Sequence, residues 1–251
     1  MEPLNVEHDG RTLRGVLHLP QPHREPVPAV VLCHGFGGNR MEFGNVFVHL
    51  SRRLAARGLA AVRFDFAGCG ESDGDIADLT VSDQVDQVLA VVDQLSRHSA
   101  LAARRVSLVG MSLGAIAASL AAAKCAVQSL AMWAPPALAL AATGPADEPT
   151  WDEIRQRGFR DHGGVPVHRK CIEDGFGIDA FADAAAYAGP VLFASGTEDP
   201  LVPGIVRDRY LEVYGDRFEA HRFDGVGHAF ETVPARERLL ETTVEFTVRH
   251  A

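Results

Sequence analysis

The pentapeptide Gly110-Met111-Ser112-Leu113-Gly114 places a serine between two glycines. A serine hydroxyl is a poor nucleophile unless it is exposed, held in a tight turn and close to a base. Flanking glycines leave room for a sharp bend between a strand and a helix, which projects the serine oxygen above a sheet. The pattern alone arises by chance in about one chain in ten of this length. The apolar run at 106–109 and the small-residue stretch at 113–124 supply the strand and helix, so we predict that Ser112 is a nucleophile.

A serine nucleophile of this kind needs a histidine base further along the chain. Among eleven histidines, His228 stands out because it follows the last predicted strand in the glycine-containing segment 225–230. An imidazole with a pKa near neutrality can take and return a proton. Most of the others have no such setting: His49 lies in a predicted helix, His221 in a predicted strand, and His8, His98 and His250 near exposed ends or connections.

The third member should be an acid that orients the imidazole and stabilises the imidazolium. Asp199 follows the strand predicted at 191–194, and the chain order Ser112, Asp199, His228 is typical of one large class of hydrolases. Glu198 stays open as the alternative acid. Asp208, inside the next predicted helix, is a poorer candidate.

Acyl transfer also needs donors for the developing oxyanion. The backbone N–H of Leu113, the residue after the nucleophile, is one candidate. The second is the N–H of Phe36, in the glycine-rich turn His34-Gly35-Phe36-Gly37-Gly38-Asn39. Glycines let backbone amides approach a substrate oxygen, which usually contributes a few kcal/mol to the transition state.

These residues require a scaffold that brings distant loops together, and the apolar pattern predicts one. Continuous apolar runs are typical of strands buried on both faces. A hairpin around Asp9-Gly10 within residues 1–20 precedes them, and a more alternating strand at 218–223 ends the series. The buried runs are 29–33, 60–64, 106–109, 129–133 and 191–194.

Helical spacing of apolar residues alternates with these strands. This order predicts an α/β fold with a mostly parallel sheet, helices on both faces and a ligand site beyond the carboxyl ends of the strands. The predicted helices are 42–57, 81–96, 113–124 and 234–249.

Residues 136–188 interrupt this alternation, with Gly, Pro and charged residues and no clear buried strand. A stretch of that length is too long for a plain connection in a compact domain. We predict a core formed by 1–135 and 189–251, with 136–188 inserted as a lid over the carboxyl edge of the sheet.

Composition narrows the functional classes. The 251 residues carry a formal net charge of −9 and no Lys/Arg run, which argues against a nucleic-acid partner. We expect no membrane partner, because no stretch approaches the roughly 18 apolar residues that span a bilayer. Without a visible secretory signal or a CxxC pair, we expect reduced thiols in a cytoplasmic protein. The cysteines are Cys33, Cys69, Cys125 and Cys171.

The ordered motifs resemble the α/β-hydrolase superfamily, which implies an eight-stranded, mostly parallel sheet. They are most similar to lidded carboxylesterases, which include cinnamoyl and feruloyl esterases, and to serine-aminopeptidase-like hydrolases. The resemblance runs from about residue 11 to the C-terminus, excepting the insertion. It implies the triad Ser112, Asp199 and His228, with oxyanion donors at Phe36 and Leu113. The segments that carry it are 34–39, 64–74, 110–114, 196–199 and 227–228.

Two departures limit what the resemblance implies about the substrate. Cys69 stands where relatives commonly have a histidine, and 136–188 shows no clear match to the lid that holds the phenolic ring in feruloyl esterases. Candidate substrate contacts are Phe36, Met111 and Trp151. The insertion's other aromatic residues, at 159, 176, 181 and 187, could line a pocket, but we favour packing for most of them.

The leading hypothesis is a carboxylesterase that cleaves small acyl or aromatic-acid esters through an acyl-enzyme, without metal or organic cofactor. No His/Cys/Asp/Glu group shows zinc-ligand spacing. The same triad could instead serve a thioesterase, an amidase or peptidase, or a C–C bond hydrolase. A non-catalytic small-molecule binding protein is the third hypothesis. As a partner we expect a small acyl substrate, and as assembly a monomer or a homodimer.

Overall fold

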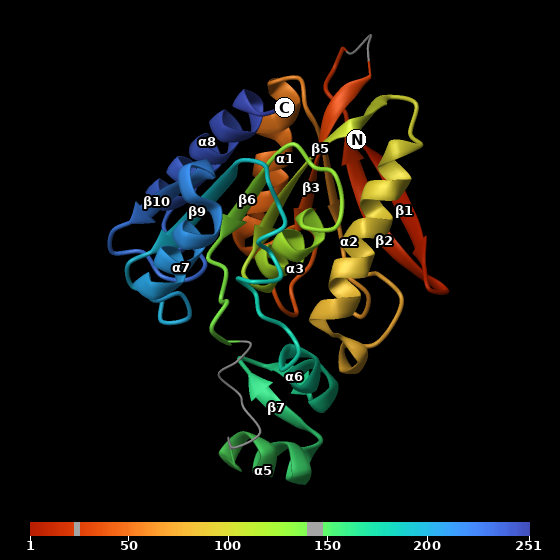
Figure 1. Cartoon of the computed structure of the whole chain (residues 1–251). Helices are drawn as coiled ribbons and strands as arrows, with labels where there is room; N and C mark the ends of the chain where they lie inside the picture. The colour runs from red at the N-terminus through yellow and green to blue at the C-terminus, as the bar shows by residue number, and fades with distance from the viewer. Residues whose placement is uncertain (23–25, 140–147) are drawn as a thin grey trace.

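The computed structural model describes residues 1–22, 26–139 and 148–251 (Figure 1). A central eight-stranded sheet runs in the order β1-β2-β4-β3-β5-β6-β9-β10. β1 pairs antiparallel with β2, and β2 with β4, whereas every other neighbour in the sheet is parallel. The strands are β1 (Glu2–His8), β2 (Arg11–His18), β3 (Val27–Cys33), β4 (Ala60–Phe64), β5 (Leu101–Met111), β6 (Leu130–Trp133), β9 (Val191–Gly196) and β10 (Phe218–Phe223).

The predicted mostly parallel sheet is confirmed, and burial explains why the apolar runs marked its central strands. Every residue of β4, β6 and β9 is buried, whereas the edge strand β10 is largely half-buried or exposed. Strands covered on both faces need apolar side chains on both, so their sequences do not alternate.

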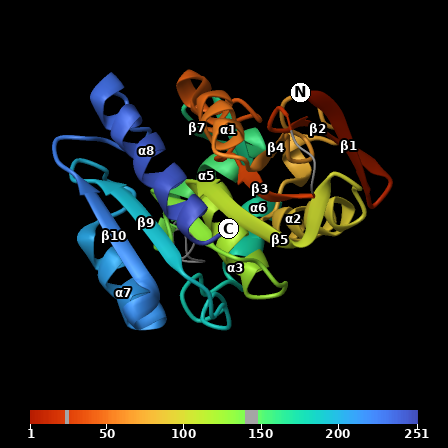
Figure 2. The same cartoon turned by 90° about the horizontal axis from the view of Figure 1, so that it is seen from above.

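Helices cover both faces of the sheet, as the sequence predicted (Figure 2). α1 and α8 lie on one face, and α2, α3 and α7 on the other. On the first face, the indole of Trp133 on β6 contacts α8, where its Nε1 donates to the Thr243 hydroxyl at 3.0 Å. These helices are α1 (Val46–Ala56), α2 (Val81–Ser96), α3 (Leu113–Ala122), α7 (Gly204–Tyr214) and α8 (Val233–Arg249).

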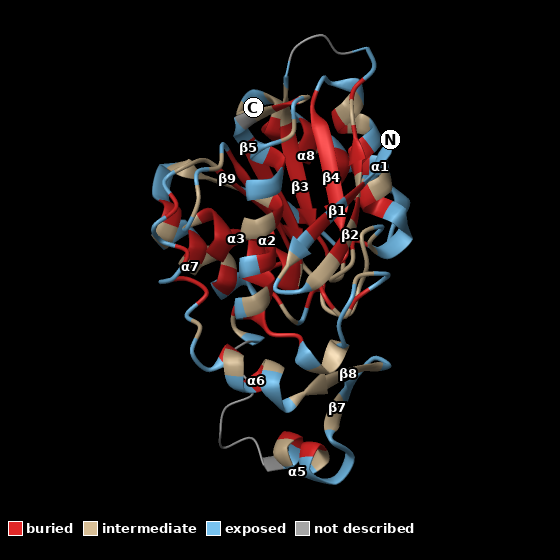
Figure 3. Cartoon of the chain, turned by 90° about the vertical axis from the view of Figure 1, so that its right-hand side faces the viewer, coloured by how far each residue is buried: buried red, intermediate tan, exposed pale blue. Residues whose placement is uncertain are grey.

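A small group of elements lies apart from the core, beyond the carboxyl edge of the sheet (Figure 1). It comprises α5 (Glu148–Arg157), the hairpin β7 (Phe159–His162) and β8 (Val165–His168), and α6 (Arg169–Gly175). Most of its side chains are half-buried or exposed (Figure 3). The hairpin was not predicted, because strands with little burial carry no continuous apolar run.

The end of the predicted lid packs with the core. Ala180, Phe181, Ala184 and Tyr187 are buried in the main hydrophobic cluster. The Phe181 ring lies 4.7 Å from that of Tyr210 on α7, measured between centroids. The division of the chain at 136–188 stays a prediction, and these contacts place 180–187 against the core. Residues 140–147 of that range lie outside the described part of the chain.

Two further properties concern the chain as a whole. Cys33 and Cys69 are buried, Cys125 and Cys171 are half-buried, and all four are free thiols. Among the described residues, no helix combines the length and the apolar character needed to cross a bilayer.

Candidate active site

Ser112 lies between β5 and α3, in a backbone conformation that residues other than glycine rarely adopt. Its φ of 53° and ψ of −124° bend the chain sharply, and its N–H donates to the carbonyl of Trp133 at 2.8 Å. A Cβ at Gly110 would overlap the backbone of Ala115, and one at Gly114 would overlap the carbonyl oxygens of Cys33 and His34. Both glycines are therefore required for the bend, which explains the pentapeptide's pattern.

The structure brings the three predicted triad residues together. The Nε2 of His228 lies 2.8 Å from the Ser112 hydroxyl, and its Nδ1 lies 2.7 Å from the Asp199 carboxylate. The Asp199 side chain is fully buried, and its second oxygen accepts the N–H of Leu201 at 2.9 Å. With Nδ1 protonated toward the carboxylate, Nε2 is free to accept the serine proton.

Contacts between the acid and histidine loops set this geometry. The N–H of Glu198 donates to the carbonyl of Val226 at 3.0 Å, and the N–H of Gly225 donates to the Thr197 hydroxyl at 2.9 Å. Glu198 is exposed, whereas Asp199 is buried. Asp208, the other candidate acid, pairs with Arg207 on α7. Of these carboxylates, Asp199 is the one hydrogen-bonded to His228.

The glycine-rich turn after β3 lies directly beside the serine. A Cβ on Gly35 would be 3.3 Å from the Ser112 Cβ. The N–H of Gly38 donates to the carbonyl of Gly35 at 3.1 Å, which closes the turn around Phe36. Leu113 is the first residue of α3, where N–H groups have no intrahelical carbonyl to bond. Both proposed oxyanion donors thus flank the nucleophile.

His34 connects this turn to the loop after β4. Its fully buried ring accepts the N–H of Phe66 at Nε2, 3.0 Å away, while Nδ1 donates to the Gly35 carbonyl at 2.8 Å. Burial lowers the pKa of His34, so the ring stays neutral. Its role here is to fix the turn.

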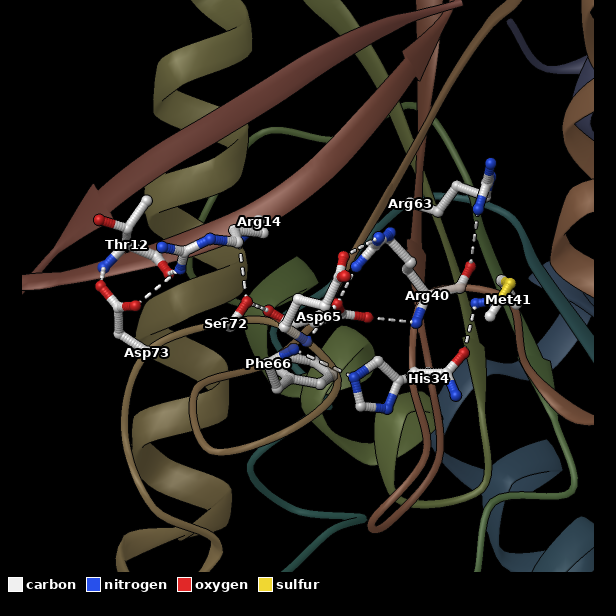
Figure 4. Close-up of polar contacts among 12 residues, drawn as sticks. Thr12, Arg14, His34, Arg40, Met41, Arg63, Asp65, Phe66, Ser72 and Asp73 are labelled. Atoms are coloured by element: carbon white, nitrogen blue, oxygen red, sulfur yellow. Dashed lines mark hydrogen bonds and ion pairs between the residues drawn. The ribbon is translucent and has the colours of Figure 1, made fainter.

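A buried carboxylate that the sequence prediction did not single out holds the far end of the turn (Figure 4). The Asp65 side chain is fully buried, accepts the N–H groups of Arg40 at 2.6 Å and Glu71 at 3.0 Å, and pairs with the Arg40 guanidinium. A Cβ at Gly70 would overlap this carboxylate. The sequence signal was Asp65 and Gly70 within the glycine-rich segment 64–74, but their pairing depends on the fold.

Cys69 lies against the same turn. The N–H of Gly37 hydrogen-bonds its sulfur, but burial and the nearby Asp65 raise the pKa of the thiol to about 11. Burial also raises the pKa of Cys33. Both side chains are therefore neutral thiols at pH 7 and serve as small apolar groups.

The β7–β8 hairpin reaches the glycine-rich turn. The rings of Phe36 and His162 are 5.9 Å apart edge to face, and a Cβ on Gly37 would lie 2.5 Å from Val165. The N–H of Ser82, at the start of α2, also donates to the Asp174 carboxylate of α6 at 3.0 Å. These contacts join β7, β8 and α6 to the glycine-rich turn and to the start of α2.

The three candidate substrate contacts are placed differently. Phe36 is half-buried in the turn next to the serine, and Met111, the residue before Ser112, is buried. Trp151 packs against Phe176, with 6.1 Å between ring centroids. It lines a cavity of about 570 Å³ whose lining residues all fall between positions 151 and 176: Trp151, Ile154, Arg155, Gly158, Arg169, Glu173 and Phe176. The triad is not part of that cavity.

Within the described residues, no group of three or more His, Cys, Asp or Glu side chains could hold a metal ion. The chemistry that the arrangement supports is proton transfer from Ser112 to His228, with the Asp199 carboxylate facing the charge that forms.

A family comparison matches residues 30–240 to the alpha/beta hydrolase family. Est1E from Butyrivibrio proteoclasticus, solved with ferulic acid bound, is similar over 98% of both chains with a TM-score of 0.86 and 24% identity. The mouse alpha/beta hydrolase domain-containing protein 10 is similar over 100% of both chains, with a TM-score of 0.78 and 20% identity. At such identities these structures show the fold alone.

Curated relatives are uncharacterized proteins. One from Mycobacterium tuberculosis is 26% identical over 88% of this chain and 69% of its own length. One from Escherichia coli is 33% identical over 88 residues, which are 35% of this chain and 29% of that protein. The match therefore spans less than a third of the Escherichia coli protein's length.

Proposed function

Because this chain belongs to the alpha/beta hydrolase family, we propose that it is a serine carboxylesterase acting through an acyl-enzyme. The observation that carries the proposal is the hydrogen-bonded sequence Ser112, His228, Asp199, with both heavy-atom distances below 3 Å. Serine, base and acid in this geometry form the arrangement that activates a hydroxyl for attack on a carbonyl.

In the first half-reaction the Ser112 oxygen attacks the ester carbonyl while His228 Nε2 takes its proton. The N–H groups of Phe36 and Leu113 stabilise the negative charge that develops on the carbonyl oxygen. The tetrahedral intermediate collapses as His228 returns the proton to the leaving alcohol. Water then attacks the acyl-serine, with His228 as its base, and releases the acid.

We assign the substrate to the class of small acyl or aromatic-acid esters. The structural similarity to Est1E, solved with ferulic acid, supports this class, as does the aromatic side chain of Phe36 in the glycine-rich turn next to the nucleophile. Residues 136–188 act as a lid in this proposal, and the contacts of His162 and Val165 with the glycine-rich turn support that role. A substrate contact at Trp151 has no such support, because the cavity that Trp151 lines does not include the triad. We further propose a cytoplasmic monomer or homodimer.

The same triad can cleave thioesters, amides or a carbon–carbon bond, so the bond must be identified by kinetics. We expect kcat/KM for a small acyl ester to exceed that for the matched thioester and amide. A thioester preference of about a hundredfold or more, roughly 2.7 kcal/mol in transition-state binding, would overturn the esterase assignment.

Substitution of the nucleophile tests the mechanism. We expect Ser112→Ala to abolish p-nitrophenyl acetate hydrolysis while the melting temperature stays close to wild type, because the hydroxyl contributes chemistry rather than packing. If the variant hydrolysed the ester at the wild-type rate, Ser112 would not be the nucleophile. If the folded wild type hydrolysed no acyl substrate and bound one without turnover, the non-catalytic binding hypothesis would replace the proposal.

A further inference from the structure

Glu42 carries backbone strain at the edge of the candidate site. Its φ of 60° and ψ of 168° lie in a region that is essentially restricted to glycine. Such strain persists only where surrounding contacts hold it, and it concentrates at functional sites. Ser112, with its φ of 53°, is another strained residue, and the glycine-rich turn separates the two in space.

The contacts that hold Glu42 are on its side chain. One carboxylate oxygen accepts the N–H of Gly35 at 2.8 Å, and the other accepts the N–H of Phe43 at 2.9 Å. The backbone is fixed as well, since its N–H donates to the carbonyl of Asn39 at 3.0 Å. The strained backbone at Glu42 therefore directs its carboxylate back toward the N–H of Gly35, the glycine that lies beside Ser112.

The hydrogen bond from Gly35 to Glu42 affects the position of the next residue, Phe36. Gly35 lies between His34, which the buried network fixes, and Phe36, the proposed oxyanion donor. A glycine can rotate freely, so the direction of the following N–H depends on what holds the glycine in place. Arg40 and Asp65 hold the far end of the turn, whereas the Glu42 carboxylate holds the Gly35 amide itself.

We propose that Glu42 is a positioning residue for the oxyanion hole. Its carboxylate fixes the Gly35 amide and thereby holds the N–H of Phe36 at the distance and direction that an oxyanion requires. The backbone strain at Glu42 is retained because this conformation places the carboxylate within hydrogen-bond distance of the Gly35 N–H. The inference rests on the proposed function, because it requires acyl transfer at Ser112.

The substitution Glu42→Gly separates positioning from stability, because glycine relieves the strained φ while removing the carboxylate. We expect kcat for p-nitrophenyl acetate to fall by at least about tenfold with KM nearly unchanged, since the lost interaction acts in the transition state. The affinity for a trifluoromethyl ketone, which forms an oxyanion on the serine, should fall by a similar factor. The melting temperature should stay at or above that of wild type.

Two variants serve as controls. Glu42→Gln keeps a side-chain oxygen that can accept the Gly35 N–H, and should stay within about threefold of the wild-type kcat, much less than the loss of an oxyanion donor. Asn45→Gly loosens the backbone three residues after Glu42, outside the glycine-rich turn. Asn45 also has a positive φ, of 58°, and its side chain caps no helix, so this variant should leave kcat unchanged.

The outcomes distinguish the inference from the proposed function. A wild-type protein with no esterase activity would remove the proposed function itself. With an active wild type, a Glu42→Gly variant of normal kcat would refute the positioning role. A lower melting temperature that accounts for the lost activity, or an equal loss in Glu42→Gln, would also refute it.

Discussion

At the residue scale, close approach of backbone segments determines which side chains the site tolerates. Gly114 lies against the carbonyl oxygens of Cys33 and His34, so α3 can begin directly beneath the glycine-rich turn. This packing places the start of α3, at Leu113, next to the turn that also approaches Ser112 through Gly35. The glycines of the pentapeptide are thus a requirement of packing and of chemistry together.

We expect Gly114→Ala to destabilise the protein by about 2 kcal/mol or more, because the added methyl group would overlap two carbonyl oxygens in a fixed backbone. Urea unfolding measures this change. Gly204→Ala is the matched control, since a Cβ there meets nothing within 4 Å and the residue begins α7. An equal loss in both variants would contradict the packing argument.

The identity of the acid is a second question at this scale. We expect Asp199→Asn to lower kcat by about 10³- to 10⁴-fold, because an amide favours the wrong histidine tautomer. The neighbouring Glu198→Gln should stay within a fewfold of wild type, because Glu198 is exposed and is not bonded to His228. Steady-state kinetics distinguishes them, and the reverse pattern would make Glu198 the acid.

Residue spacing predicted these triad positions because each carries a local signal, a strand end followed by a glycine-rich or acidic loop. Glu42, Asp65 and Arg40 were not predicted. Arg40 and Asp65 pair between two separate loops, and Glu42 bonds the Gly35 amide only because the intervening segment folds back on itself. The strained φ of Glu42 has no sequence signal either, because glutamate is not a residue that favours it.

At the element scale, the sequence predicted the parallel strands and the helices that bury whole faces. It did not predict β7 and β8, whose strands are half-buried or exposed and include polar residues such as Arg160 and Asp161. The unpredicted hairpin nevertheless contacts the glycine-rich turn through His162 and Val165. The least regular sequence in the chain therefore borders the candidate site.

This contact predicts coupling between positions 37 and 165. Gly37→Ala should lower kcat/KM by about tenfold or more, since its Cβ would lie 2.5 Å from Val165 and its φ is 61°. Val165→Ala removes the overlapping methyl groups, so the double variant should recover part of the loss. A double-mutant cycle on p-nitrophenyl acetate measures the recovery. If the effects of the two substitutions on kcat/KM were strictly additive, the Gly37→Ala loss would not arise from overlap with Val165.

At the scale of the whole molecule, buried neutral histidines link stability to pH. His18 on β2 is buried, and its Nε2 accepts the Nε–H of Arg63 from the neighbouring strand β4 at 3.2 Å. Burial and the charge of Arg63 lower the pKa of His18 from 6.5 to about 4. The unfolded chain therefore binds a proton at this histidine over a pH range where the folded chain does not.

The free energy of unfolding should fall as the pH drops from about 6.5 to about 4. His18 should account for at most about 3 kcal/mol of this loss. Above pH 6.5 its full stabilising contribution should be present, because the histidine is then neutral in both the folded and the unfolded chain. Urea unfolding across this range measures it. His18→Gln should flatten the dependence, whereas His49→Gln, at an exposed residue of α1, should not. Equal slopes in wild type and His18→Gln would show that another group is responsible.

The central claim is that this fold presents Ser112 as an activated nucleophile. A fluorophosphonate probe tests it most directly, because the probe reacts covalently with serines that a nearby base activates. We predict stoichiometric labelling of folded protein, located at Ser112 by peptide mass spectrometry and lost in Ser112→Ala and His228→Ala. Folded protein that stays unlabelled at Ser112, while a known serine hydrolase is labelled in the same mixture, would contradict the account.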